Sequence, residues 1–346
     1  MNNHGGFHER AFRGSIAFAA SFLLMTMSSR AGDTGVRYLS WRPDAVSNAL
    51  GGAGTAAVCN AFAAFHNPAN LATARDIDAG FSFVKPLPLF DGVTHSFFAF
   101  AWNEPHLGAF AISSNYYRKG THARTGSAGP EVLETEDLVD HHWKLSYARR
   151  ISDQVTLGIG IGMLNTEISD YGTEAYVGTA SATAITLDAG VLVHGLLPEL
   201  MVAPEGDEEA PVRGLNVALS LLNVGPEISY IDESQADPMP TRLVFGTSCA
   251  PFSSRVITLL LVADLEAPFY PSFRLADTHL GAEVSILRFA ALRAGYVLDS
   301  TGERSSYATW GGGLQLDFVS MNVANYNRTY DSVWHFDISF SMEIYQ

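Results

Sequence analysis

Residues 51–72 read GGAGTAAVCNAFAAFHNPANLA. The spacing of their glycines points to a more specific chemistry than any other motif in the chain. Its run G-A-G-T-A-A, beginning at Gly52, matches the G-x-G-x-x-G/A pattern that brings a backbone turn close to the diphosphate of a dinucleotide. Asp76 follows at about the distance at which that pattern places its acidic residue. Such a site needs an apolar strand before the glycines and a complete helix after them. The preceding WRPDAVSNAL contains a proline and no β-branched run, and HNP interrupts the Ala-rich turn that follows, so the sequence disfavours a nucleotide site.

No other short motif matches an established catalytic or metal-binding pattern. The sequence lacks a G-x-S-x-G elbow, an H-E-x-x-H pair and a Walker phosphate loop. His141 and His142 are adjacent, but neighbours in a strand point to opposite faces and make a poor metal pair. Cys59 and Cys249 could pair in an oxidising compartment, although two isolated small apolar residues is the simpler interpretation. We therefore expect no catalytic residue, no metal site and no cofactor.

The composition differs from that of most soluble and nucleic-acid-binding proteins. Hydrophobic residues make up 47% of the 346 residues and charged residues 16%, with 31 Gly, 21 Phe and 13 Tyr. This is too apolar for a disordered chain and low in charge for a soluble one. The formal net charge of −15 argues against nucleic acid as a partner, because binding needs cations that neutralise phosphates.

The N-terminus has the features of an export signal. Arg10 and Arg13 form a basic region, and GSIAFAASFLLMTM follows as an apolar core. This core is shorter than the roughly twenty residues that a membrane-spanning helix needs. Ser29 and Ala31 are small residues at the positions that a signal peptidase reads. We expect residues 1–31 to be a signal peptide that is cleaved after Ala31.

After residue 75, apolar residues recur with a period of two, which is the signal of β-strands. In the last segment Trp334 and Phe336 fall on one face, and His335 and Asp337 fall on the other. A soluble sandwich would also produce such stripes. Segments long enough for a tilted span, aromatic stripes, and polar faces of Gly, Thr and Ser favour a transmembrane barrel. The predicted strands are 76–85, 93–103, 106–117, 140–150, 153–167, 182–194, 212–225, 241–250, 255–266, 274–285, 288–299, 305–317, 318–328 and 333–345.

The predicted fold class is therefore all-β: a transmembrane antiparallel β-barrel of about 14 strands over residues 76–346. The segments 119–140 and 198–211 are long, polar and mostly acidic, which is typical of external loops. Charged residues on the polar strand faces would point into the lumen and pair there rather than perform acid–base chemistry. They are Lys144, Asp188, Arg242, Glu283, Arg293, Asp317, Asp337 and Glu343.

Given a barrel, the N-terminal motif resembles that of the PorV/PorQ family of outer-membrane proteins, which are relatives of the FadL-type long-chain fatty-acid transporters. That family typically reads MGGAGVA and then NPAGLA, which correspond here to LGGAGTAA (50–57) and NPANLA (67–72). The chain departs from the pattern where Cys59-Asn60 replaces an acidic pair and Asn70 replaces a glycine. Further matches, in the same order along the chain, are LSYARRISDQVTLGIGI (145–161), LLNVGPEISY (221–230), ALRAGY (291–296) and HFDISFSMEI (335–344).

The resemblance implies a barrel in the bacterial outer membrane with residues 32–75 folded inside it as a hatch. Glycines would let the hatch backbone pack closely within the lumen, and an Asn-Pro pair would form a turn just before the first strand. The residues of this hatch motif are Gly51, Gly52, Gly54, Asn67, Pro68 and Ala69.

Three functions are open for such a barrel. As in the PorV branch, it would be a type IX-like secretion component that binds exported proteins through their C-terminal signal domains, together with other secretion components. As in the fatty-acid transporter branch, it would pass fatty acids or other hydrophobic compounds, along a groove lined by Phe62 and Phe65. It could also be a structural barrel without transport. The chain length favours the secretion component, because fatty-acid transporters usually carry longer hatches and loops. In each case the outer-membrane lipid is a partner and no enzymatic activity is expected.

Overall fold

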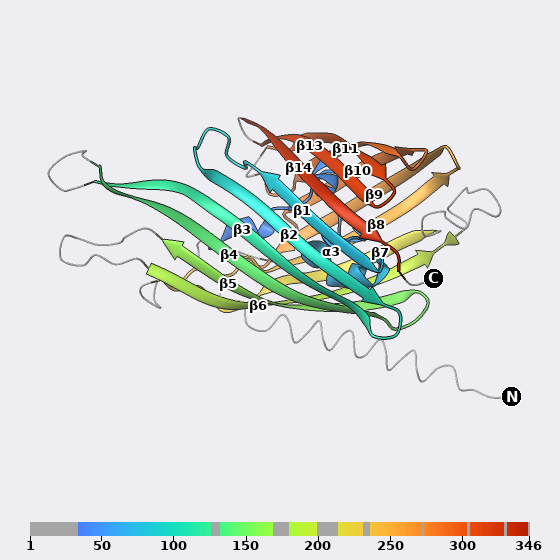
Figure 1. Ribbon diagram of the computed structural model, residues 1–346, viewed down its shortest axis with the longest axis horizontal. Coiled ribbons are helices and arrows are strands. Elements are labelled where there is room, and N and C mark those ends of the chain that lie inside the picture. The colour runs from blue at the N-terminus through green and yellow to red at the C-terminus, as the bar shows by residue number, and fades with distance from the viewer. Residues whose placement is uncertain are drawn as a thin grey trace. The chain divides into compact units, whose positions relative to one another are not determined.

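Fourteen antiparallel strands close into a barrel, because each strand pairs with its neighbours in sequence and the first pairs with the last (Figure 1). This computed structural model describes residues 34–125, 132–168, 180–198, 214–230, 236–270, 273–302, 305–328 and 331–344. The predicted fold class is confirmed. The strands are β1 (Ile77–Val84), β2 (Val93–Glu104), β3 (Gly108–Thr125), β4 (Val132–Arg150), β5 (Val155–Ile168), β6 (Ala180–Leu196), β7 (Leu215–Val224), β8 (Arg242–Ser253), β9 (Ile257–Pro268), β10 (Asp277–Ile286), β11 (Ala290–Asp299), β12 (Tyr307–Leu316), β13 (Val319–Arg328) and β14 (Asp331–Met342).

Side chains along the strands alternate between an exposed outer face and a buried inner face. On β14, Trp334 and Phe336 are 46% and 53% exposed, whereas His335 between them is 0% exposed. The outer face carries Phe, Trp, Leu and Ile around the barrel, which suits contact with lipid tails rather than water. Among the described residues, no helix is both long enough and apolar enough to cross a bilayer.

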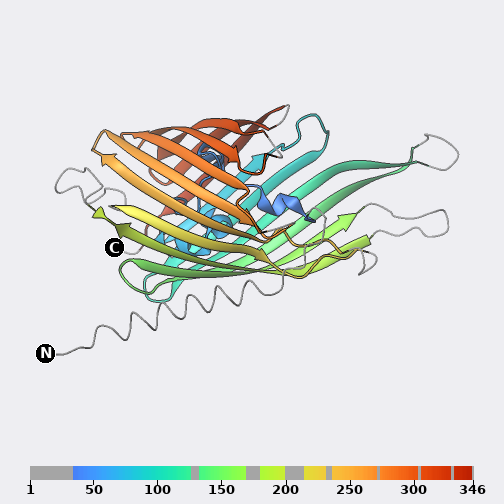
Figure 2. The same cartoon turned by 180° about the vertical axis from the view of Figure 1, so that it is seen from behind.

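The N-terminal segment lies inside the ring of strands, as Figures 1 and 2 show. We call residues 34–75 the hatch. The predicted signal peptide, residues 1–31, and its cleavage site fall outside the described residues. The helices of the hatch pack against the inner faces of the strands. They are η1 (Arg37–Ser40), α2 (Ala45–Ala49), α3 (Ala63–His66) and η2 (Pro68–Thr73).

The loop predicted at 119–140 is wrong, because most of this segment is strand. β3 continues to Thr125 and β4 begins at Val132, and the two pair beyond an irregularity after Arg118. In Figure 1 this end of the hairpin reaches past the neighbouring strands. A ribbon that leaves the barrel has polar surroundings on both faces, so its sequence loses the apolar alternation on which the prediction rested.

The order of the strands assigns each connection to one of two barrel ends. The connections after even-numbered strands include the short turns 105–107, 151–154 and 254–256, and we call this the short-turn end. The opposite end is called the long-loop end, and the β3–β4 connection lies there. The loop predicted at 198–211 lies in the connection after β6, and its residues 199–211 are outside the described residues.

Two charged residues expected in the lumen lie elsewhere. Asp317 is exposed in the turn between β12 and β13, and Glu343 is exposed just after β14. Glu343 lies 3.6 Å from Arg75 instead. Both positions are at strand ends, where the alternation of faces no longer holds. Cys59 and Cys249 are free, and Cys249 lies on the outer face of β8, away from the hatch.

Candidate functional site: the hatch and its seat in the barrel

The glycine-rich turn is anchored to the inner wall by side chains of β9, β10 and β12. Gly51 and Gly52 have φ values of 72° and 91°, which favour glycine. The Gly51 N–H donates to the Thr309 hydroxyl at 2.9 Å, and the Gly51 carbonyl lies 2.7 Å from Nδ1 of His279. Gly54 N–H donates to the Asp264 carboxylate at 2.9 Å. The motif that looks like a phosphate loop is therefore a docking turn.

The Asn-Pro motif forms hydrogen bonds within the hatch and between the hatch and the wall. Asn67 caps η2 by accepting a hydrogen bond from the Ala69 N–H at 3.0 Å. Its amide donates to the carbonyls of Thr55 and Val191, each at 3.2 Å. Asn70, which replaces the family's glycine, donates to Thr55 at 3.0 Å and to the carbonyl of Val58 at 2.9 Å. The departure at position 70 thus adds two hydrogen bonds within the hatch.

Glycines of the wall let the hatch backbone approach closely. A Cβ atom on Gly158 of β5 would overlap the backbone of Ala69, and one on Gly190 of β6 would overlap the Asn67 side chain. Such positions explain the Gly-rich polar faces of the predicted strands, because any larger side chain would displace the hatch. The other wall glycines in contact with the hatch are Gly80, Gly246, Gly281, Gly295 and Gly311.

Charged side chains of the wall form ion pairs that also hold the hatch. Arg42 of the hatch lies 2.5 Å from Glu266 of β9. Lys144 of β4 pairs with Asp188 of β6 and donates to the carbonyl of Ala64 at 3.2 Å. The lumen-facing placement predicted for Lys144 and Asp188 is confirmed by their burial. Arg242, Glu283, Arg293 and Asp337, also predicted to face the lumen, lie on the inner face and form contacts there.

The two adjacent histidines point to opposite faces, as expected. His142 is buried and its Nε2 lies 2.8 Å from the hydroxyl of Thr186. His141 lies against the ring of Tyr116, with centroids 4.5 Å apart. Within the described ranges, no group of three or more His, Cys, Asp or Glu side chains is arranged to hold a metal ion.

Asp44 is the buried N-cap of α2 and pairs with His66. Its carboxylate accepts from the Ser47 N–H at 2.7 Å and lies 2.6 Å from Nε2 of His66. Burial alone would raise the pKa of Asp44, but His66 and the Ser47 donors lower it from 3.8 to about 2. The charged form is therefore the one that the hatch stabilises.

The lowered pKa of Asp44 predicts that α2 loses stability at low pH. Because the folded-state pKa lies below the unfolded value, the Asp44 carboxylate contributes about 2 kcal/mol at pH values above about 4, and this is lost as the pH falls toward 2. Hydrogen exchange of residues 44–50 against pH measures the loss. In Asp44→Asn, which does not titrate, protection should be lower throughout and should not decline further over that pH range.

Phe62 and Phe65 form the apolar side of the hatch. They are 1% and 5% exposed, and their rings lie 5.9 and 6.1 Å from that of Phe97 on β2. The Arg242 guanidinium lies 5.2 Å from the centre of the Phe65 ring. The two phenylalanines are packed rather than lining an open groove. We call their contact with the wall the alanine seam; its wall residues are Phe97, Ala99, Ala101, Ala109, Ala111 and Ala148.

An aromatic cluster at the long-loop side of the hatch was not predicted. Tyr38 stacks on Tyr117 at 5.0 Å, and Trp41 meets Tyr117 edge-on at 5.3 Å. His95 lies 6.0 Å from Trp41 and its Nε2 is 2.6 Å from Asn115. Burial and the nearby Asp140 charge raise the pKa of Tyr38 well above its ordinary value. No local signal in the sequence places residues 38–41 beside His95.

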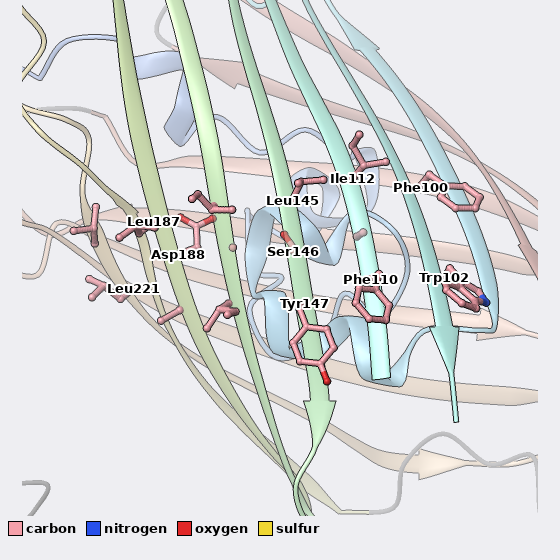
Figure 3. A pocket seen from close by; sticks show the side chains of 16 residues that line it. Phe100, Trp102, Phe110, Ile112, Leu145, Ser146, Tyr147, Leu187, Asp188 and Leu221 are labelled. Atoms are coloured by element: carbon pink, nitrogen blue, oxygen red, sulfur yellow. The ribbon is translucent and has the colours of Figure 1, made fainter. Parts of the chain in front are cut away.

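A groove of about 890 Å³ crosses the outer face of the wall over β2–β7. Figure 3 shows Trp102, Phe110 and Tyr147 side by side on neighbouring strands, with ring centres 6.0 and 5.0 Å apart. Small or polar inward residues, including Ser146 and Asp188, form its floor. The groove therefore lies outside the same strands β2–β4 that carry the alanine seam on their inner face.

Comparison with known proteins identifies solved structures with a similar fold, but no protein with a matching sequence. No protein-family model matches the chain, and no curated protein matches its sequence. The toluene transporter TbuX of Ralstonia pickettii is 13% identical with a TM-score of 0.52, and the match covers 87% of this chain and 98% of TbuX. The monoaromatic hydrocarbon channel CymD is 11% identical with a TM-score of 0.54, covering 88% and 98%. The toluene transporter TodX of Pseudomonas putida is 12% identical with a TM-score of 0.50, covering 87% and 98%.

The chain thus shares its fold with these three transporters and channels. At such low identity the likeness extends to the fold alone. The more specific resemblance to the PorV/PorQ family has no matching family model behind it and stays a prediction.

Proposed function

We propose that the protein is an outer-membrane barrel that transports hydrophobic compounds, with fatty acids and small aromatic hydrocarbons as the substrate classes. The observation that carries this proposal is the alanine seam beside Phe62 and Phe65, with the apolar groove outside the same strands. Apolar side chains on the inner face of a barrel are unusual, because that face is ordinarily polar. The seam is packed against Phe62 and Phe65 in this structure, so it would offer an apolar solute a surface when the hatch moves away from it.

The fold neighbours support this reading over secretion. TbuX and TodX are described as toluene transporters and CymD as a hydrocarbon channel. Their structures superpose on 87–88% of this chain and on 98% of their own, so the length of this chain does not favour secretion over transport. The interpretation as a type IX-like receptor for exported proteins has no comparable support and remains a prediction.

Uptake measurements test the proposal. The full-length protein is produced in a bacterial host that lacks its own long-chain fatty-acid barrel, and initial uptake of labelled oleate and labelled toluene is measured. We expect uptake of at least one compound above that of the host without the barrel. Uptake unchanged for both would reject the proposal. Co-purification of exported proteins that share a C-terminal β domain would then support the secretion reading.

A larger side chain in the alanine seam is expected to slow uptake. Ala109 is 0% exposed on the inner face of β3, so Ala109→Leu fills the seam. Ala324→Leu is the matched control, because Ala324 is equally buried but packs against α2 from β13, four strands away from β3 around the barrel. Ala109→Leu should reduce initial uptake several-fold more than Ala324→Leu at equal amounts of folded barrel. Equal uptake by the two variants would place the path elsewhere.

A further inference from the structure

The groove on the outer face is a trough between two rows of side chains that run across the strands. Each row joins residues that are paired directly between neighbouring strands from β2 to β7. One row runs from Phe100 on β2 to Val224 on β7. Residues between the rows, such as Ser146 and Gly160, point inward, so the backbone forms the floor of the trough (Figure 3). The other row consists of Trp102, Phe110, Tyr147, Ile159, Ala189 and Leu221.

The trough has the length and slope of a lipid chain in one leaflet. Six strands about 4.8 Å apart make it roughly 24 Å long. Strands of outer-membrane barrels tilt by about 40° from the membrane normal, so a row perpendicular to them rises roughly 15 Å through the membrane over that length. This rise is about half of the roughly 30 Å hydrocarbon thickness, which is the depth of one leaflet.

The trough begins at the short-turn end with an aromatic rim. Trp102 and Phe110 lie two residues from the ends of β2 and β3, and Tyr147 lies three residues from the end of β4. The same row is seven residues from the end of β6 at Ala189, so it climbs into the membrane from β2 toward β7. Trp and Tyr are enriched at the level of the lipid headgroups. Short turns lie on the periplasmic side of such barrels, so the rim lies at the headgroups of the periplasmic leaflet.

An exposed cation lies beside this rim. Arg149 follows Tyr147 by two positions on the outer face of β4 and is exposed. Within the described part of the chain, no acidic side chain forms an ion pair with it. The Glu104 carboxylate, at the same end of β2, instead accepts from the N–H groups of His106 and Leu107. A guanidinium at headgroup level attracts lipid phosphate and can bind it through two parallel hydrogen bonds.

We propose that the trough binds one acyl chain of an anionic phospholipid of the periplasmic leaflet, with the lipid phosphate on Arg149. The chain lies between the two rows and contacts side chains on both sides, which a lipid against a flat wall cannot do. A volume of about 890 Å³ is within the range of roughly 300–1,000 Å³ that is usual for ligand sites. A transported hydrocarbon has no group for Arg149 to bind, so the cation favours a phospholipid. This site is independent of the proposed transport.

Native mass spectrometry of the full-length protein in detergent, with added dipalmitoyl phosphatidylglycerol, tests the site. We expect one lipid to bind at a concentration several-fold below that at which further lipids bind. Arg149→Gln should weaken this first binding about fivefold. Arg255→Gln is the matched control, because Arg255 is exposed in the turn after β8 at the same barrel end but outside the trough. It should leave the first binding unchanged. Dipalmitoyl phosphatidylcholine, whose headgroup carries no net charge, should bind more weakly.

A second pair of variants tests the wall of the trough. Leu145→Ala removes a side chain from one row, and Leu292→Ala removes the same side chain from the outer face of β11; the two leucines are 59% and 64% exposed. Leu145→Ala should weaken the first binding several-fold and Leu292→Ala should not. The absence of a distinct first lipid, or equal effects within either pair of variants, would overturn the proposal. Displacement of that lipid by an equimolar amount of oleate would assign the trough to a transported compound and would also overturn it.

Discussion

Replacing Lys144 with methionine is expected to lower the free energy of unfolding by about 3–5 kcal/mol, because Asp188 is left as an unpaired buried charge. The two side chains are 6% and 1% exposed. Lys144 also donates to the Ala64 carbonyl of the hatch, and Asp188 accepts from the Asn223 N–H at 2.7 Å. The substitution thus affects two wall strands and the hatch together. Urea unfolding in detergent, followed by tryptophan fluorescence, measures the change.

Two controls separate the buried charge from the loss of a side chain. Adding Asp188→Asn to Lys144→Met should recover most of the lost stability, because the amide is neutral and its oxygen still accepts the N–H of Asn223. Arg75→Met removes a partner of the Arg75–Glu343 pair, whose side chains are 47% and 68% exposed. That change should cost at most about 1 kcal/mol. Similar losses in Lys144→Met and Arg75→Met would show that burial of the pair is unimportant.

The second large effect is expected from Gly158→Ala on β5. The new methyl group would overlap the backbone of Pro68 and Ala69, and a backbone segment held at both ends has little room to move. We expect a loss of about 1–3 kcal/mol, the usual cost of overpacking, together with faster hydrogen exchange in residues 67–72. A larger residue at position 158 should displace the hatch further.

Gly160→Ala is the matched control for this substitution. Gly160 lies two residues further along the same inner face of β5, but its Cβ would lie 3.3 Å from Cδ of Lys144 and from the hydroxyl oxygen of Ser146. Those side-chain atoms can shift by a few tenths of an ångström, so the variant should retain nearly normal exchange in residues 67–72. If Gly158→Ala also retained it, the close contact between wall and hatch would not hold η2 in place.

The strands could be predicted from sequence because their signal is local. A residue on β14 such as Phe336 faces lipid and its neighbour His335 faces the lumen. The period of two can therefore be recognised from consecutive residues alone. The same signal fails where a strand leaves the barrel, which is why the β3–β4 hairpin beyond Arg118 was mistaken for a loop.

The contacts within the candidate site depend on residues far apart in the chain. Lys144 and Asp188 could be assigned to the lumen from their strand faces, but their pairing depends on the barrel register, which brings the two side chains together across β5. Tyr38 and Trp41 join His95 and Tyr117 only after the hatch has entered the barrel. Phe62 and Phe65 were singled out from the motif, while the alanines they meet come from three strands.

The sequence by itself determined an apolar, strand-rich chain that forms a barrel of about fourteen strands, because alternation and composition are properties of neighbouring residues. The position of the glycine-rich N-terminal segment inside the barrel was expected only from the family resemblance. The tertiary structure alone decided how the hatch is held: which carboxylate meets which backbone N–H, which wall glycines admit it, and where the apolar seam lies. These depend on the register and closure of the barrel, which bring together residues such as Ala45 and Asp337 that are 292 positions apart.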